Sequence, residues 1–268
     1  MSKYTIGIDL GGTTMTAGIV NENYEIVGKL TWATRLPRPA EDLEKALADL
    51  CRTVARDNKV DFADIKYVGI GTPGSVNFTT GFVGFNTNFG YYDWNLGPDL
   101  EALLGCKVYV ENDTRAMTYG EYMCGVGNNE DTMIFVNASW GLGVGLVIDR
   151  KLFYGRSGFS GEFGHFPLLD NEVICRCGKR GCLETGASGS AVHRIFMEKL
   201  AQKRVSMLSD KYNRGEQILL EDILEALGQE DVLAIEVMET VGHTLGKAMA
   251  GLINLFNPDL IVLGGTLA

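Results

Sequence analysis

The chain opens with the sequence YTIGIDL at residues 4–10, GGT at 11–13 and TMTAGIV at 14–20. Apolar residues alternate along the first and third segments, which is typical of β-strands, and the glycines between them indicate a tight turn. Such a turn lets backbone N–H groups approach phosphate oxygens, and a carboxylate at a strand end can hold Mg²⁺ through water. Candidate phosphate and magnesium ligands are therefore Asp9, Gly11, Gly12 and Thr13. A plain hairpin turn is the alternative.

A second unit of the same kind follows at residues 132–148. We predict a strand at 132–136, a glycine-rich turn at 137–145 and a strand at 146–148, so the chain contains two related halves. The second turn offers further candidate phosphate ligands in Ser139, Gly141 and Gly143. Two such turns suit a nucleotide held between two lobes.

Strands and helices alternate through the rest of the chain, which indicates an α/β fold. Further strands are predicted at 26–33, 67–71, 107–110 and 260–263, and helices at 40–57, 114–124, 190–204, 220–227 and 230–256. We place an N-terminal small lobe at residues 1–113 and a C-terminal large lobe at 114–268.

Two strands end in loops of the kind that bind ligands in open α/β sheets: Thr72-Pro73-Gly74 and Glu111-Asn112-Asp113. Asp113 at the start of a helix is either an N-cap or a general base that takes a proton from a sugar hydroxyl as it attacks a γ-phosphate. The two roles are compatible. Asn112 is a candidate for anchoring a neighbouring hydroxyl.

A metal site is predicted from one histidine and three cysteines within eighteen positions: His165, Cys175, Cys177 and Cys182. Tetrahedral Zn²⁺ takes this ligand set, and the intervening glycines let the loop bend back on itself. Four protein ligands leave no open position for water, so the site is structural and a zinc hydrolase is excluded. The alternative is three free cysteines and a histidine with ordinary hydrogen bonds.

Two carboxylates, Glu162 and Glu184, flank this loop. Carboxylates accept hydrogen bonds from vicinal hydroxyls, so the pair favours a polyol ligand. Solvated surface carboxylates are the alternative.

Composition limits the partners. The 268 residues include 24 Lys and Arg against 34 Asp and Glu, a net charge of -10, which argues against nucleic acid as a partner of this chain. The N-terminus does not look like a signal peptide, and we find no apolar stretch long enough for a membrane span, so we expect a cytoplasmic protein. The strand at 260–263 lies almost at the end of the sequence, and we expect further residues beyond it.

Taken together, these residues resemble the ROK family of repressors, open reading frames and kinases. The most specific match is GEFGH at 161–165 followed by CRCGKRGCLE at 175–184, and NPDLIVLGG at 257–265 resembles the adenosine-side motif, including Gly264 and Gly265. The resemblance implies a two-lobed actin-like ATPase (ribonuclease H-like) fold that holds ATP with Mg²⁺ and a sugar. It makes Asp113 the catalytic base. It assigns sugar contacts to Gly74, Asn112, Asp113, Glu162, His165 and Glu184, and zinc to His165, Cys175, Cys177 and Cys182.

One departure from the family pattern concerns the second turn. The kinases usually carry Gly-Thr-Gly there, whereas this chain has Ser139-Trp140-Gly141, which places ATP use in question. The leading hypothesis is an ATP-dependent, glucokinase-like kinase that phosphorylates a hexose or N-acetylhexosamine, at O6. The second is a ROK-type sugar-sensing regulator with little or no kinase activity. The first strand begins by Tyr4, with no room for a preceding DNA-binding module, which favours the enzyme. The resemblance also implies a homo-oligomer, a dimer or tetramer.

Overall fold

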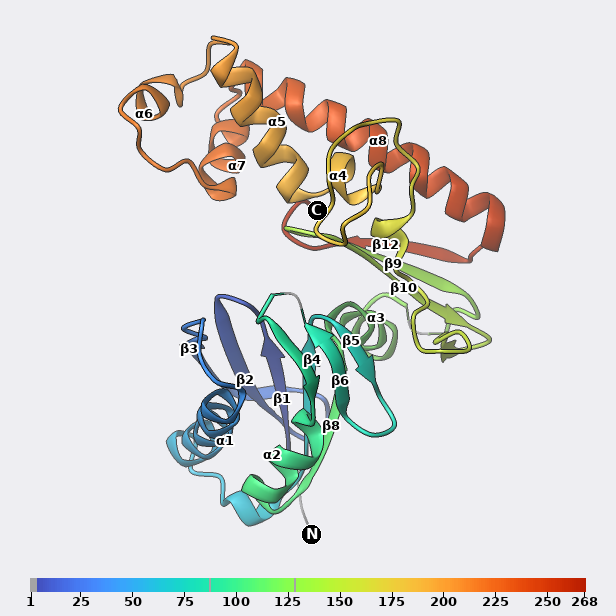
Figure 1. Ribbon diagram of the computed structural model, residues 1–268. Coiled ribbons are helices and arrows are strands. Elements are labelled where there is room, and N and C mark those ends of the chain that lie inside the picture. Colours follow the sequence, from blue (N-terminus) through green and yellow to red (C-terminus); the bar gives the residue numbers. More distant parts are fainter. Residues whose placement is uncertain (1–3, 87, 128) are drawn as a thin grey trace. The chain divides into compact units, whose positions relative to one another are not determined.

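The computed structural model describes residues 4–86, 88–127 and 129–268. The chain divides into two compact units, Met1–Asn128 with Tyr154–Phe159, and Asn129–Phe153 with Ser160–Ala268. Figure 1 shows that each unit contains its own sheet and its own helices. Within the part of the chain that the structure describes, none of the helices combines the length and apolar character that a membrane crossing needs.

The first unit is built on a five-stranded sheet in the order β3-β2-β1-β4-β8. Its strands are β1 (Tyr4–Leu10), β2 (Thr14–Val20), β3 (Ile26–Ala33), β4 (Ile65–Thr72) and β8 (Lys107–Asn112). β2 is antiparallel to both β1 and β3, and β4 and β8 run parallel to β1. The parallel strands β1, β4 and β8 therefore end at the same edge of the sheet.

Alternating side chains bury one face of this sheet against α1 (Ala40–Asp57). Fully buried positions on the strands, such as Ile6 and Ile19, meet the apolar stripe of the helix, which includes Leu43, Leu47 and Val54. Helix α3 (Asp113–Cys124) packs against β4 and β8. The predicted strands and helices of this unit are thus confirmed where their periodicity is strong.

A three-stranded antiparallel sheet in the first unit escapes the sequence analysis. It consists of β5 (Ser75–Asn77), β6 (Phe82–Asn86) and β7 (Tyr91–Trp94), and helix α2 (Leu96–Leu104) follows it. The short helix η1 (Phe62–Asp64) precedes β4. Strands of three to five residues contain too few positions for alternation to stand out.

A buried carboxyl group makes the stability of this unit depend on pH. Glu44 of α1 is 6% exposed and accepts a hydrogen bond of 2.6 Å from Nε1 of Trp94. Burial raises the pKa of Glu44, and the nearby Asp99 and Glu41 add to this, whereas the Trp94 hydrogen bond and Lys45 oppose it. The folded state therefore binds the proton more tightly than the unfolded state. The contribution of Glu44 to stability is therefore most favourable at low pH and falls as the pH rises from the unfolded pKa through the folded one.

We expect Glu44→Gln to flatten this decline, because glutamine keeps the acceptor for Trp94 and carries no charge. A difference of one in the pKa of Glu44 between the folded and unfolded states changes the free energy of unfolding by about 1.4 kcal/mol. The free energy of unfolding of both proteins can be measured by urea unfolding at several pH values between 4.5 and 8, with Trp fluorescence as the signal. The variant should gain stability over the wild type as the pH rises. Parallel curves for the two proteins would contradict the expectation.

The second unit repeats the strand plan of the first. Its sheet has the order β11-β10-β9-β12, with β9 (Met133–Ala138), β10 (Leu142–Ile148), β11 (Lys151–Leu152) and β12 (Leu260–Gly264). β9 and β10 form an antiparallel hairpin and β12 runs parallel to β9, as β4 does to β1. The prediction of two related halves is confirmed.

The second unit also contains helices. They are η2 (Phe163–His165), α4 (Glu184–Ala187), α5 (Gly189–Ala201), α6 (Ser209–Asn213), α7 (Leu220–Gly228) and α8 (Val232–Phe256). Buried side chains of β9 and β10, such as Val136 and Val144, form a core with Leu245 and Leu252 of α8. A second core lies between α5, α7 and α8.

Two sequence-based boundaries differ from the structure. The predicted division between residues 113 and 114 cuts α3 away from β8, whereas both belong to the first unit. The backbone instead changes unit three times, after Asn128, Phe153 and Phe159, and no composition shift marks these points. Strand β10 begins at Leu142, so the glycine-rich turn predicted at 137–145 is only three residues long.

Candidate active site and metal centre

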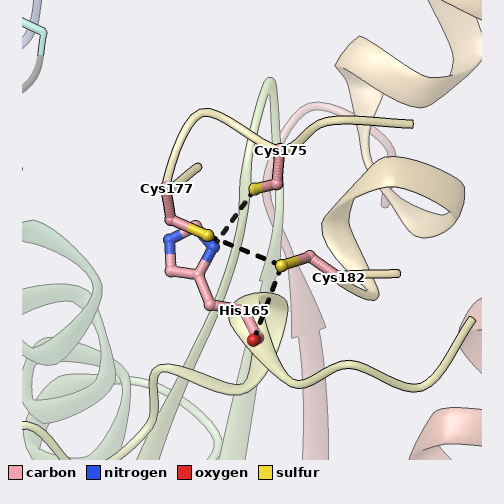
Figure 2. Close-up of side chains that lie close together, drawn as sticks. All are labelled: His165, Cys175, Cys177 and Cys182. Atoms are coloured by element: carbon pink, nitrogen blue, oxygen red, sulfur yellow. Dashed lines mark hydrogen bonds between the residues drawn. The ribbon is translucent and has the colours of Figure 1, made fainter. Parts of the chain in front are cut away.

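The four predicted metal ligands lie together in the second unit (Figure 2). Their ligand atoms are all within 4.8 Å of one another: one nitrogen of His165 and the sulfurs of Cys175, Cys177 and Cys182. Nδ1 of His165 is 3.5 Å from Sγ of Cys175, and Sγ of Cys177 is 3.5 Å from Sγ of Cys182. Gly178 and Gly181 adopt positive φ, which lets the loop fold back on itself.

This arrangement fits tetrahedral Zn²⁺. Zinc–sulfur bonds of about 2.3 Å place neighbouring ligand atoms about 3.5–3.8 Å apart, close to the distances found here. Burial is the largest cause that raises the pKa of Cys175, to about 12, so this thiol carries little charge unless a cation stabilises the thiolate. Three thiols and an imidazole with this geometry form a closed, four-ligand set.

The two ring nitrogens of His165 have different neighbours. Its Nδ1 lies on the side of the thiols, and its Nε2 is 4.0 Å from a carboxylate oxygen of Glu162. A histidine that ligates metal through one nitrogen keeps an N–H on the other. Nε2 of His165 and the carboxylate of Glu162 therefore form a donor and acceptor pair that suits a hydroxyl group.

Glycines bring the loop that carries Glu162 against β10. A Cβ at Gly161, which has φ +87°, would collide with the carbonyl oxygen of Val144, and one at Gly164 would collide with that of Leu142. The close approach fixes η2 and hence His165 on the sheet. These glycines are required by packing.

Glu184 contacts the second glycine turn. Its Oε2 accepts a hydrogen bond of 3.0 Å from the backbone N–H of Leu142, and its Oε1 is 3.8 Å from Sγ of Cys175. A Cβ at Gly141 would lie 2.8 Å from Oε2. Glycine at 141 thus leaves room for Glu184 in addition to any ligand. The sequence did not reveal this contact, because the partners are 42 residues apart.

The second turn also meets the Gly264-Gly265 motif. Oγ of Ser139 lies 2.8 Å from Oδ1 of Asn137 and 3.3 Å from the backbone nitrogen of Thr266, and a Cβ at Gly265 would lie 2.6 Å from the Ala138 carbonyl oxygen. The structure therefore brings Ser139 and Gly141 to Gly264 and Gly265 within one unit. Gly143 does not join them in the turn. It lies within β10, opposite Asn137, because the strand begins before it.

The first glycine turn, residues 11–13, lies at the edge of the first unit's sheet. The backbone N–H of Gly11 donates to the carbonyl of Thr14, and Thr34 bonds the carbonyls of both Gly11 and Thr13. Asp9 lies in β1 beside Thr16 and Gly71. Partial burial raises the pKa of the Asp9 carboxyl by desolvation, and the nearby Lys29 acts in the opposite direction.

Asn112 and Asp113 lie at the same edge, where β8 passes into α3. The side chain of Asn112 caps the helix by accepting from the backbone N–H of Arg115, and its amide donates to the carbonyl of Gly74 at 3.3 Å. The N-cap role considered for Asp113 therefore falls to Asn112. Asp113 is the first helical residue, and its Oδ1 accepts from the backbone N–H of Thr114 at 2.7 Å.

The Gly74 loop depends on glycine and on Asn86. Gly74 has φ +105°, and a Cβ there would collide with the carbonyl oxygen of Phe85. The buried Asn86 side chain donates to the carbonyl of Pro73 at 2.6 Å. The Asn86 side-chain amide therefore supports this loop. Ser75–Asn77 line a cavity of about 520 Å³ with Tyr154–Phe159.

A buried ion pair beside Asp113 was not predicted. Arg115 is 4% exposed; its Nε donates to Glu111 at 2.8 Å and its Nη1 to the carbonyl of Gly158 at 2.8 Å. The hydroxyl of Tyr154 donates to the other oxygen of Glu111 at 3.0 Å, and this ring stacks on Phe78. The i, i+4 spacing of Glu111 and Arg115 was the available signal.

We expect Arg115→Met to destabilise the first unit by about 3 kcal/mol, because it leaves the Glu111 carboxylate largely buried without its partner. Urea unfolding measures the loss. Lys45→Met is the matched control, since Lys45 pairs with Asp42 on the exposed surface and should cost under about 1 kcal/mol. Equal losses in the two variants would contradict this reading of the ion pair.

Comparisons with known proteins agree with the motifs. The profile of the ROK family matches residues 5–268. A glucokinase of Thermotoga maritima is 35% identical over 263 residues, which cover 97% of this chain and 81% of that protein. The crystal structure of a ROK family glucokinase from Streptomyces griseus in complex with glucose and AMPPNP is 32% identical, with a TM-score of 0.84 over 98% of this chain and 83% of that one.

A regulator is also among the similar structures. A ROK family transcriptional regulator, a homolog of the E. coli MLC protein, is 28% identical, with a TM-score of 0.86 over 100% of this chain and 66% of that one. These neighbours confirm the expected actin-like ATPase fold. With a family profile matched over nearly its whole length, the chain belongs to the ROK family.

Proposed function

We propose that this protein is an ATP-dependent sugar kinase of the glucokinase type, which transfers the γ-phosphate to a hydroxyl, O6, of a hexose or N-acetylhexosamine. One observation carries the proposal. The first glycine turn, Gly74 and Asp113 follow three parallel strands that end at one edge of the sheet, where Asp9 pairs with Gly71 and Thr72 pairs with Asn112. A phosphate turn and a candidate base at one sheet edge suit phosphoryl transfer.

In this proposal Asp113 accepts the proton of the attacking hydroxyl. Its place at the first turn of α3 suits a carboxylate, because a helix N-terminus favours negative charge. Asn112 and the Gly74 loop are the sugar-binding groups of the first unit. Mg²⁺, which enters with ATP, neutralises phosphate charge, and Asp9 is the group in the first unit placed to hold it through water.

The second unit carries candidate groups of its own. Glu162, Glu184 and Nε2 of His165 bind sugar hydroxyls, and Ser139, Gly141, Gly264 and Gly265 line the nucleotide side. Zinc on His165, Cys175, Cys177 and Cys182 is structural and fixes the orientation of His165. We place the enzyme in the cytoplasm, where thiols stay reduced, and expect it to form a homo-oligomer.

A sugar-sensing regulator without kinase activity is the second candidate. Trp140 favours it, because an indole occupies the second turn and its side chain is 43% exposed there. The similarity to the transcriptional regulator supports it as well.

Sugar-dependent release of ADP from Mg-ATP separates the two candidates. The panel is glucose, mannose, fructose, allose, N-acetylglucosamine and N-acetylmannosamine. Turnover that depends on one of these sugars supports the kinase and identifies its substrate. Thermal stabilisation by a sugar, together with no turnover on any of them and no stabilisation by ATP, would leave the regulator.

A further inference from the structure

Trp140 in the second glycine turn contacts the cysteine loop. The guanidinium carbon of Arg176 lies 6.0 Å from the centroid of the Trp140 ring, within reach of a cation–π interaction. Arg176 stands between Cys175 and Cys177. The centroid of the indole ring also lies 5.8 Å from that of the His193 ring, and Nε2 of His193 is 2.9 Å from the carbonyl oxygen of Ile218. The indole therefore contacts a residue of α5 and a residue of the metal loop.

The same turn is held from its other end. Leu142, two residues after Trp140, donates its backbone N–H to Glu184, which follows the metal ligand Cys182 by two positions. The residues that contact the turn on both sides are thus neighbours of metal ligands in the sequence. Gly141 lies between these two contacts.

The turn has further anchors that do not involve the loop. The backbone N–H groups of Gly189 and Ser190 donate to the carbonyls of Ser139 and Trp140 at 2.7 and 3.0 Å. These bonds hold the carbonyl side of the turn. The Trp140 side chain, by contrast, contacts Arg176 in addition to His193, and the Leu142 N–H donates to Glu184.

The loop that carries Arg176 is supported by local contacts, among them the bridge between Ile174 and Arg180 and the ion pair of Arg180 with Glu172. Its residues from 176 to 180 are exposed, and its internal backbone bonds include Cys175 to Lys179 and Gly178 to Cys175. Exposed segments with few buried apolar contacts open locally at a low cost in free energy, so a cross-link would stabilise this loop. A metal on the four ligands would hold Arg176 and Glu184 in place against the turn.

We propose that the Cys₃His metal site positions the second glycine turn for the nucleotide, through Arg176 on Trp140 and Glu184 on Leu142. Arg176 and Trp140 are positioning residues in this scheme. The proposal rests on the proposed kinase function, because it assigns the turn to ATP. It implies that metal loss weakens nucleotide binding in addition to sugar binding.

Isothermal titration with AMPPNP and Mg²⁺ tests the link. Arg176→Ala should retain its zinc and bind AMPPNP about two- to fivefold more weakly, the range expected for an exposed cation–π contact. Arg180→Ala is the matched control, because Arg180 lies on the same loop and pairs with the exposed Glu172. It should bind AMPPNP like the wild type. Equal affinities for wild type and Arg176→Ala, or equal losses in both variants, would overturn the proposal.

Tryptophan fluorescence supplies a readout that needs neither turnover nor nucleotide. Removal of zinc with a chelator should change the emission of the wild type and of Arg180→Ala. The change should be much smaller in Arg176→Ala and in Trp140→Phe. A full change in both of those variants would also refute the link. If the protein binds no AMPPNP at all, the kinase function fails, and the fluorescence comparison alone decides whether the metal loop positions the turn.

Discussion

Cys182→Ser is expected to abolish zinc binding and to destabilise the second unit. Cys182 is fully buried, and its sulfur lies 3.5 Å from that of Cys177. A serine hydroxyl does not replace a thiolate as a zinc ligand, and the remaining three groups then face one another without a cation. Structural zinc contributes about 10 kcal/mol or more in small zinc domains at neutral pH. Here the sheet and α8 supply their own core, so we expect a smaller loss of about 3 kcal/mol or more.

Two measurements check this expectation. Zinc content of the purified protein should fall from close to stoichiometric to background. The thermal unfolding temperature should drop by roughly 6–12 °C, and a chelator should lower that of the wild type but not that of the variant. Cys106→Ser is the matched control, because this half-buried thiol lies in the first unit, away from the cluster. Full zinc content in Cys182→Ser would contradict the assignment of the ligands.

Much of the fold is predictable from the sequence because its elements are long and strongly periodic. Helix α1 begins and ends at the predicted residues, and β3 does so as well. The repeated strand, turn and strand pattern predicted two related sheets. Short elements were missed for the opposite reason, since three residues of β5 carry too little periodicity.

The sequence also predicted the composition of the metal site, because all four ligands lie within eighteen positions. It did not predict contacts between distant segments. Glu184 on Leu142, Arg115 on Gly158 and Arg176 on Trp140 each join residues more than 30 positions apart. Trp140 looked like a departure from a phosphate turn, and only its neighbours in space suggest a use for it.

Local chemistry also misled the assignment of individual residues. Asp and Asn both cap helices well, so the sequence could not decide between Asn112 and Asp113. The structure gives the cap to Asn112, whose amide also contacts the Gly74 loop. Asp113 then does not serve as the cap.

Asp113→Asn is expected to reduce kcat by about 10²–10⁴-fold on the sugar that the protein phosphorylates. Asparagine has nearly the same shape and keeps an oxygen for the N–H of Thr114, so the start of α3 should be preserved. It cannot accept the proton of the attacking hydroxyl. Because the base acts in the transition state, sugar affinity should change little while kcat falls.

The control for this variant is Asp99→Asn. Asp99 is an exposed residue in the first turn of α2 in the same unit, so the substitution removes the same charge from the first turn of another helix. Steady-state kinetics and sugar titration on both variants separate the loss of a base from the loss of a charge near a helix N-terminus. If Asp113→Asn retained more than a tenth of the wild-type kcat, or lost it together with sugar binding, Asp113 would not be the base, and the Asn112–Asp113 pair would serve only to bind the sugar.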